Sequence, residues 1–455
     1  MIEKLKSFLN KITGVSYADI RYEIKRETRI IFSGTDINEV SSCPTDGYVL
    51  RLLNDKALSS SVVTSEDDIG DAIRILKNNN QIIAHFKNTP VEFADVPVIK
   101  DSFEPMLNQD PQKISIEEKI ALTRHYNQIP YGVPNIIHTD IAYLEVIREK
   151  YFVSNEGTEI FEKLITTRIA GNIISNDGGI IQTVRVGIGG SNGFGILQNR
   201  DEEFLKKARI ASDLLKAKPV SGGIYNVILN QSLAGVFTHE AFGHFSEADL
   251  IENNPSMRER MKIEAKLGVD NLNIIDDPTI PEQLGFYKYD DEGVPVKPVQ
   301  LLKNGILVGR LHSRRTAMAF NEPPNGHCVA EDYRYPPIIR MGTIFIQPQD
   351  KSFEELLQIL GDGLYLCDPM GGQTSGENFT FGAQYGYIVK NGRITDMVRD
   401  INISGNLYET LKNIIAIGND LKLGEVGSCG KGQTNIRSCY GAPHIIIKNA
   451  VIGGV

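Results

Sequence analysis

Two histidines and one glutamate lie within six residues of one another, in the segment Thr238–His244 just past the middle of the chain. The histidines, His239 and His244, stand at positions i and i+5, which places them about 140° apart around an ideal α-helix. An unbroken helix therefore cannot direct both imidazoles at one ion. Either the helix ends or widens near Gly243, where glycine makes a distortion cheap, or the two histidines do not form a metal site.

The three side chains are the ones that a zinc hydrolase uses. Zinc binds neutral imidazole nitrogens, while a glutamate beside a ligand stays off the metal and accepts a proton from water. The common pattern is H-E-x-x-H, and this chain has one residue more between Glu240 and His244. Spacing alone leaves a second interpretation open, in which one histidine caps the carbonyls of a helix end and the other packs in a partly buried surface.

Composition limits the class of protein. The 455 residues suggest two or three domains, or one large domain with an elaborate second half. Hydrophobic residues make up 41% and charged residues 23%, as in ordinary soluble proteins. The net charge of −9, with no strongly basic run, argues against a dedicated nucleic-acid binder. No signal peptide follows Met1, and no apolar stretch approaches the length of about 18 residues that a membrane helix needs. We therefore expect a cytoplasmic protein.

The five cysteines form no C-x-x-C pair, and their odd number does not suit a disulfide framework. In a reducing compartment we expect most of them to be buried, inert thiols. A cysteine that the fold brings to the two histidines could still be a ligand. The cysteines are Cys43, Cys328, Cys367, Cys429 and Cys439.

Hydrophobic periodicity in the first half predicts amphipathic helices and antiparallel strands. A meander is expected over 17–64, with turns at 34–36 and 44–47, and a hairpin turn is expected at 176–179. The glycine-rich segment 187–193 lacks the residues of a phosphate-binding loop, and we expect a mobile loop there. Helices are predicted at 1–12, 66–76, 115–129 and 201–215, and further strands at 141–153, 162–174 and 180–186.

The second half reads as β-rich. The turn residues at 219–223 are the best candidate boundary, which gives an N-terminal domain 1–220 and a C-terminal domain 221–455. Asn304-Gly305 and Asn391-Gly392 lie between apolar runs and predict type I′ hairpins. The predicted fold class is α+β: an N-terminal α/β half with a curved antiparallel sheet, and a C-terminal β-rich half carrying the helix of His239.

Further motifs follow the histidine segment in a familiar order. With them, the chain resembles the TldD/PmbA family, once described as modulators of DNA gyrase and since regarded as zinc metallopeptidases. The resemblance covers roughly 225–440 well and the first half more weakly. His327 stands where the family pattern has an arginine, and Cys439 is an additional cysteine. The motifs that carry the resemblance are Ile274–Pro278, Tyr289–Pro295, Leu302–Gly305, Ser313–Ala317, Ile339–Met341 and Ser428–Gln433.

The resemblance implies roles for particular residues. TldD-type chains keep H-E-x-x-x-H, whereas their TldE (PmbA) partners have lost it, so this chain resembles the catalytic type. By this resemblance His239, His244 and Cys429 are zinc ligands and Glu240 is the general base, with Cys439 as the alternative thiol. The family further implies a cytosolic peptidase acting on unfolded or short peptides, as a homodimer or with a TldE-like subunit. Two imidazoles and a thiolate leave a fourth zinc position open for water, as in catalytic sites.

Residues around this set each have two possible roles. Glu247 and Asp249 could orient an imidazole, or they could belong to a solvated helix end. Arg315 and Arg340 could polarise a substrate carbonyl or form structural ion pairs.

Two other functions stay open at this point. The chain could be a non-catalytic binding or assembly subunit with a structural or vacant metal site, although a structural site does not need Glu240. It could also be an amidohydrolase that acts on small molecules with the same metal set.

Overall fold

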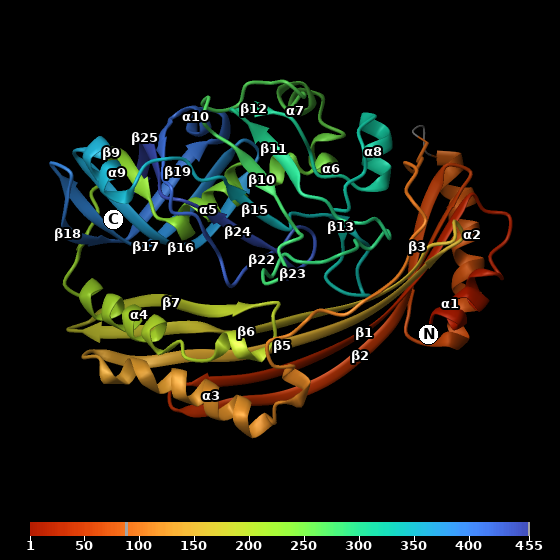
Figure 1. Cartoon of the computed structure of the whole chain (residues 1–455), viewed down its shortest axis with the longest axis horizontal. Helices are drawn as coiled ribbons and strands as arrows, with labels where there is room; N and C mark the ends of the chain where they lie inside the picture. Colours follow the sequence, from red (N-terminus) through yellow and green to blue (C-terminus); the bar gives the residue numbers. More distant parts are fainter. Residues whose placement is uncertain (87–89, 454–455) are drawn as a thin grey trace.

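The computed structural model describes residues 1–86 and 90–453. A curved sheet from the first half of the chain lies along one side of the molecule, and the β-rich second half packs against its concave face (Figure 1). This arrangement confirms the predicted α+β fold class. Within the described residues, no helix is both long and apolar enough to span a membrane.

The curved sheet has the strand order β3-β2-β1-β5-β6-β4, and β7 also pairs with β6. All pairings are antiparallel except that of β4 with β6. Alternate residues face opposite sides, so Ile20 and Ile30 pack under the helices while Arg21 and Arg29 face the second half of the chain. The strands are β1 (Tyr17–Ser33), β2 (Asp36–Asn54), β3 (Ala57–Val63), β4 (Lys100–Phe103), β5 (Ile136–Ser154), β6 (Glu159–Asp177) and β7 (Ile180–Gly190).

Four helices cover the convex side of this sheet in the described part of the chain, two at each end (Figure 1). The helix predicted to start after Ser115 has the expected capping box, in which the Ser115 and Glu118 side chains each accept from the other's backbone N–H. The helices are α1 (Ile2–Leu9), α2 (Ile69–Phe86), α3 (Ile116–Gln128) and α4 (Asp201–Leu214). Single 3₁₀ turns lie at Glu66–Asp68, Pro111–Lys113, Ile129–Gly132, Phe194–Leu197 and Gly243–Ser246.

Two local predictions in the first half are wrong. The turn expected at 44–47 lies inside β2, where Pro44 pairs with Arg26 of β1. Strand β3 reaches only Tyr48–Asn54 of β2, so Pro44 occupies a free edge, where a missing N–H is tolerated. The expected mobile loop at 187–193 begins as strand: Gly187–Gly190 belong to β7, and a Cβ on Gly189 would lie 2.6 Å from the Thr167 carbonyl oxygen.

One sheet of the second half closes on itself. Strand β16 pairs with β9, β9 with β25, β25 with β19, β19 with β17, and β17 with β16 again. The strands of this sheet are β8 (Lys218–Pro219), β9 (Gly223–Leu229), β16 (Gly363–Ser375), β17 (Asn378–Lys390), β18 (Arg393–Arg399), β19 (Ile401–Asn406), β20 (Ile414–Ile417) and β25 (Ile445–Gly453).

A second sheet, in the order β12-β11-β10-β15-β24-β21, faces the closed one across helix α5 (Gln231–Ala241). Both predicted Asn-Gly hairpins are present, with positive φ at Asn304 and at Asn391. The strands are β10 (Ile274–Asp276), β11 (Val299–Lys303), β12 (Ile306–Leu307), β15 (Thr343–Ile346), β21 (Lys422–Leu423) and β24 (Cys439–Ala442). Two short pairs are β13 (Cys328–Val329) with β14 (Ile338–Ile339) and β22 (Ser428–Cys429) with β23 (Ile436–Arg437). The other helices are α6 (Ala248–Ile251), α7 (Pro255–Arg260), α8 (Arg314–Phe320), α9 (Phe353–Leu360) and α10 (Leu407–Lys412).

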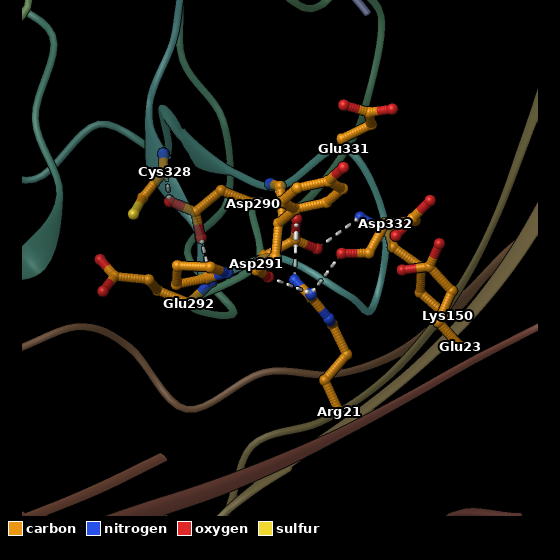
Figure 2. A network of polar contacts seen from close by, with 12 residues as sticks. Arg21, Glu23, Lys150, Asp290, Asp291, Glu292, Cys328, Glu331 and Asp332 are labelled. Atoms are coloured by element: carbon orange, nitrogen blue, oxygen red, sulfur yellow. Dashed lines mark hydrogen bonds and ion pairs between the residues drawn. The ribbon is translucent and has the colours of Figure 1, made fainter. Parts of the chain in front are cut away.

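Buried ion pairs join the concave face of the curved sheet to a loop of the second half. Arg21 of β1 forms an ion pair with Asp291 at 2.9 Å, and Lys150 of β5 reaches the same carboxylate at 3.2 Å (Figure 2). Arg51 of β2 pairs with Glu292 at 2.9 Å. These contacts fix the curved sheet against the loop, and thereby define the space between the two halves.

Candidate metal centre

Helix α5 ends between the two histidines. Asn230 caps its start by accepting from the Leu233 N–H. The last helical residue is Ala241, Phe242 has φ −131° and ψ −41°, and a 3₁₀ turn over Gly243–Ser246 follows. The turn brings His244 back toward His239, with the two ring centroids 5.1 Å apart. The structure therefore has the helix end that the i, i+5 spacing requires for a shared ligand.

Gly243 makes the turn possible by close packing. A Cβ at this position would lie 2.1 Å from Met341 Sδ and 3.1 Å from Ile344 Cδ1. Any larger residue would force either Met341 or the turn to move, and His244 would shift if the turn moved.

Cys429 completes a compact set with the two histidines. One ligand atom from each of His239, His244 and Cys429 lies within 4.8 Å of the other two, and Cys429 Sγ lies 3.5 Å from His244 Nε2. Cys429 comes from β22, nearly two hundred residues further along the chain. The structure thus brings together the three residues that the sequence selects as ligands.

One ligand-to-ligand distance of this set has the length that a zinc site requires. At zinc bond lengths of about 2.1 Å to nitrogen and 2.3 Å to sulfur, two ligand atoms of a tetrahedral site stand about 3.6 Å apart. The 3.5 Å between Cys429 Sγ and His244 Nε2 agrees with that edge. Two imidazoles and one thiol are also the donor types that zinc prefers, and three protein ligands leave one position open.

Glu240 lies beside the set but outside it. Its Oε2 is 3.9 Å from His244 Nε2, and the Thr374 hydroxyl donates to the same carboxylate at 3.0 Å and to the Glu240 carbonyl at 2.7 Å. Thr374 belongs to β16, whose far end covers the site. All four site residues line one cavity of about 720 Å³, which we call the metal cavity.

A buried carboxylate holds His244 from behind. The Nδ1 atom of His244 lies 3.1 Å from Glu247 Oε2, which also accepts from Lys431 at 3.0 Å. Arg340, fully buried, places its Nη1 3.6 Å from the other oxygen of Glu247. Asp249 accepts from Lys431 at 2.7 Å instead of touching a histidine. Of the two acidic residues suggested by sequence, Glu247 is therefore the one that orients an imidazole.

The charges around Cys429 favour its thiolate form. Burial would raise the pKa of Cys429, but His239, His244 and Arg340 lower it to about 5. Burial would lower the pKa of His244, but Glu247 and Cys429 raise it to about 10. Burial would likewise raise the pKa of Glu247, and Lys431, Arg340 and His244 hold it well below its usual range. The thiolate is the form that binds a metal, and a metal competes with the proton of His244.

Other residues singled out from sequence lie outside the set. Cys439 is fully buried, with its Sγ 3.0 Å from the Gly424 carbonyl oxygen, and is not the thiol near the histidines. Arg315 forms an ion pair with Glu252 at 2.7 Å. His327, which stands where the family pattern has an arginine, is fully buried, and its Nε2 lies 3.0 Å from Asp276 Oδ1.

Sequence reasoning missed other residues of the metal cavity, among them Thr374 and Tyr440. Thr374, which holds Glu240, is one of many threonines and carries no local signal. Tyr440 packs its ring 6.2 Å from His239 at 71° and lines the cavity. Its only sequence signal is its position next to Cys439, in the family's C-terminal region.

Comparison with known proteins relates the chain to one family. Residues 222–454 match the family model described as the PmbA/TldA metallopeptidase C-terminal domain, and residues 109–218 match the central domain of the same family. A metalloprotease of Methanothermobacter thermautotrophicus is 32% identical and aligns over 97% of this chain and 96% of its own. A zinc metalloprotease TldD homolog of Saccharolobus solfataricus is 30% identical and aligns over 97% of both chains.

The fold is shared with a solved structure of more distant sequence. TldE from Thermococcus kodakarensis superposes with a TM-score of 0.76 at 18% identity, over 100% of this chain and 99% of the other. The family models match residues 109–218 and 222–454, which include the segment of the two histidines and Cys429. This chain therefore belongs to the PmbA/TldD family of metallopeptidases.

Proposed function

We propose that the protein is a zinc-dependent metallopeptidase that hydrolyses peptide bonds in unfolded or short peptides. The observation that carries the proposal is the convergence of His239, His244 and Cys429 beside Glu240 in one cavity. A structural zinc site would have no use for a carboxylate next to the ligands, and the relatives are named as metalloproteases.

Each residue has a defined part in this proposal. A zinc ion held by the two histidines and Cys429 would supply Lewis-acid chemistry, activating water and polarising the peptide carbonyl. Glu240 accepts the proton of the attacking water and passes it to the leaving amine. Thr374 fixes the Glu240 carboxylate in the cavity by its hydrogen bond. Glu247 holds the His244 ring in the orientation that directs Nε2 toward Cys429.

The substrate is proposed to bind as an extended strand. Strand β16 pairs with β9 only over Leu364–Leu366 but pairs with β17 as far as Ser375, so its outer part has a free edge. Gly371, Gly372 and Gln373 of that part line the metal cavity. Such an edge recognises main chain in preference to sequence. Peptides with N-methylated backbones should then be poor substrates, and unchanged turnover of them would reject this binding mode.

We further propose that the protein acts in the cytoplasm as a dimer, either with itself or with a TldE-like subunit. A thiolate ligand needs a reduced cysteine, and all five cysteines are free. The shared fold with a TldE protein supports a partner of that kind. Light scattering of the purified chain, alone and mixed with a TldE-like protein, separates the two assemblies.

The deciding experiment measures metal content and activity on three variants. Cys429→Ser should lose most of its zinc by mass spectrometry, whereas Cys439→Ser, the matched control, should keep the wild-type content. Glu240→Ala should stay folded and zinc-loaded but lose peptidase activity by several orders of magnitude, because proton transfer alone contributes about 10²–10⁴-fold. A wild type that binds no zinc after reconstitution would favour the binding-subunit interpretation. Activity on small amides without activity on peptides would favour the amidohydrolase.

A further inference from the structure

A second cavity of about 800 Å³ adjoins the metal cavity, between the concave face of the curved sheet and the second half of the chain. We call it the sheet cavity. Residues shared by both linings show that the two spaces are contiguous. A peptide that extends beyond the metal cavity on this side meets the sheet cavity. The shared residues are Arg185, Pro369, Gly427, Ser428 and Tyr440.

Three arginines from three strands face the sheet cavity. Arg29 of β1 pairs in register with Leu144 of β5, and Leu144 pairs with Arg168 of β6. Residues opposite one another in a sheet point to the same face, so Arg29 and Arg168 share the concave side. Arg185 of β7 pairs with Asn172, four residues beyond Arg168 on β6, and lies on that side as well.

The acids of the sheet cavity do not neutralise these arginines. Glu203 and Glu425 both pair with Arg200, at 2.7 and 2.8 Å. The remaining acid, Asp368, forms its ion pair with Lys207. Every carboxylate of this lining is thus already held by another cation.

Arg168, which is half-buried, and Arg185, which is exposed, form no ion pair with any described residue, although the protein as a whole carries a net charge of −9. Arg29 pairs with Glu27 at 3.1 Å, at the rim. Two further cations of the lining, Lys206 and Lys422, are exposed. The acidic average composition would place carboxylates beside these arginines, but the carboxylates of this lining pair with other cations.

The charge of Arg168 is costly without an anionic ligand. Burial and the neighbouring Arg29 guanidinium lower the pKa of Arg168, and Glu27, which already pairs with Lys25 and Arg29, opposes them only in part. A desolvated guanidinium near a like charge destabilises the folded protein unless an anion compensates it. A carboxylate is the natural partner, because its two oxygens match the fork of the guanidinium.

We infer that Arg168 and Arg185 form a carboxylate-binding wall that makes acidic peptides the preferred substrates of the metal cavity. This inference rests on the proposed peptidase function. The carboxylate can come from an acidic side chain or from the C-terminus of the peptide. Arg185 lies beside Asn172 of β6, which is four residues, or about 13 Å, along the strand from Arg168. The two guanidinium groups can thus hold carboxylates several residues apart on one extended peptide.

The test measures binding by calorimetry on the zinc-loaded Glu240→Gln chain, so that turnover does not interfere. Peptides of one length and one neutral sequence carry either glutamate or glutamine at the varied positions, and either a free or an amidated C-terminus. The acidic peptides should bind about tenfold more tightly than the neutral ones, and the difference should shrink with added salt. Loss of the preference on amidation assigns the carboxylate to the C-terminus, and loss on replacing glutamate assigns it to the side chain.

Variants then locate the preference. Arg168→Gln and Arg185→Gln should each reduce binding of acidic peptides about tenfold and leave neutral peptides unchanged. Arg168→Lys keeps the positive charge and should retain part of the preference for acidic peptides. This result would show that the loss in Arg168→Gln comes from the missing charge and not from misfolding. Arg209→Gln is the matched control, because Arg209 lies on α4 outside both linings and is 60% exposed.

Two results would overturn the inference: equal binding of acidic and neutral peptides by the parent chain, or an equal loss for all peptides in Arg168→Gln. These failures are distinct from failure of the proposed function. Charge-selective binding without any cleavage in the chain with Glu240 intact would reject the peptidase but keep the wall. Cleavage without charge selectivity would reject the wall but keep the peptidase.

Discussion

At the scale of single residues, Glu247 is the one that ties the candidate ligands to the protein. It is fully buried, lies 3.1 Å from His244 Nδ1 and accepts from Lys431 at 3.0 Å. In Glu247→Gln the amide has no negative charge to orient the imidazole. We expect zinc affinity to fall about 10–100-fold, as for other residues that support a metal ligand. Competition with a chromophoric chelator measures this affinity directly.

Glu252→Gln provides the matched control for this change. Glu252 follows α6 in the same region, but it pairs with Arg315 at 2.7 Å and touches none of the candidate ligands. Its substitution should leave zinc affinity unchanged. If Glu247→Gln and Glu252→Gln bind zinc equally well, the role of Glu247 is wrong.

Residue types and spacing could identify only part of this site. His239, Glu240 and His244 stand out because they are close in sequence, and Cys429 because its motif resembles a family pattern. Glu247 and Asp249 could not be told apart, since both are acidic and both lie just beyond His244. Their roles separate only in the folded chain, where Lys431 and Arg340 arrive from distant segments and hold Glu247 against the ring.

At the scale of elements, the end of α5 positions one candidate ligand relative to the other. Gly243→Ala places a Cβ 2.1 Å from Met341 Sδ, which forces the 3₁₀ turn or Met341 to move. Such overpacking costs about 1–3 kcal/mol of unfolding free energy. The same movement shifts His244, so zinc content should fall together with stability. Urea unfolding and metal analysis of one preparation measure both quantities.

Gly70→Ala is the comparison that isolates this packing effect. Gly70 lies in helix α2, and a Cβ there would meet nothing within 4 Å. Alanine should raise stability by up to about 1 kcal/mol, because it restricts the unfolded chain. Gly243→Ala with unchanged stability and unchanged zinc would show that the turn does not depend on this close contact.

Local chemistry explains which elements could be predicted. The Asn-Gly hairpins at Asn304 and Asn391 and the capping box at Ser115 depend on a few neighbouring residues, and the structure confirms them. The errors at 44–47 and 187–190 have the opposite cause. There, pairing with β1 and β6 stabilises strand despite proline and glycine, and that pairing is decided outside the segment.

At the scale of the whole molecule, the charged face of β1 shows what a single sequence does not reveal. Alternating charged and apolar residues normally indicate one buried face and one that faces water. Here the charged face is buried, because a loop far along the chain supplies Asp291 and Glu292 as partners. No local pattern near Arg21 encodes this distant complementarity. The division into 1–220 and 221–455 stays a prediction, and contacts of this kind decide how independently the two parts fold.

Removal of Arg21 tests how strongly these contacts join the two halves. Arg21 is 2% exposed and forms an ion pair with Asp291 at 2.9 Å. Figure 2 shows both residues. In Arg21→Met, Asp291 stays buried with Lys150 as its remaining ion pair, and we expect a loss of about 3 kcal/mol in unfolding free energy. Asp291→Asn added to Arg21→Met should cost less than the sum of the two single changes, because the residues form one network. Additive losses would show that they do not interact.

The pH dependence of stability provides a second measure of the same network. Burial would raise the pKa of Asp291, but Arg21, Lys150 and Arg148 lower it well below its usual range. The folded state then binds fewer protons than the unfolded state, whose carboxyl titrates near about pH 4. The stabilisation is therefore present above about pH 4 and is lost as the pH falls below it. Without Arg21 the folded pKa lies closer to the unfolded value, so Arg21→Met should lose less stability than the wild type between about pH 5 and pH 3. Urea unfolding across that range measures both slopes, and parallel curves would mean that Arg21 does not set the pKa of Asp291.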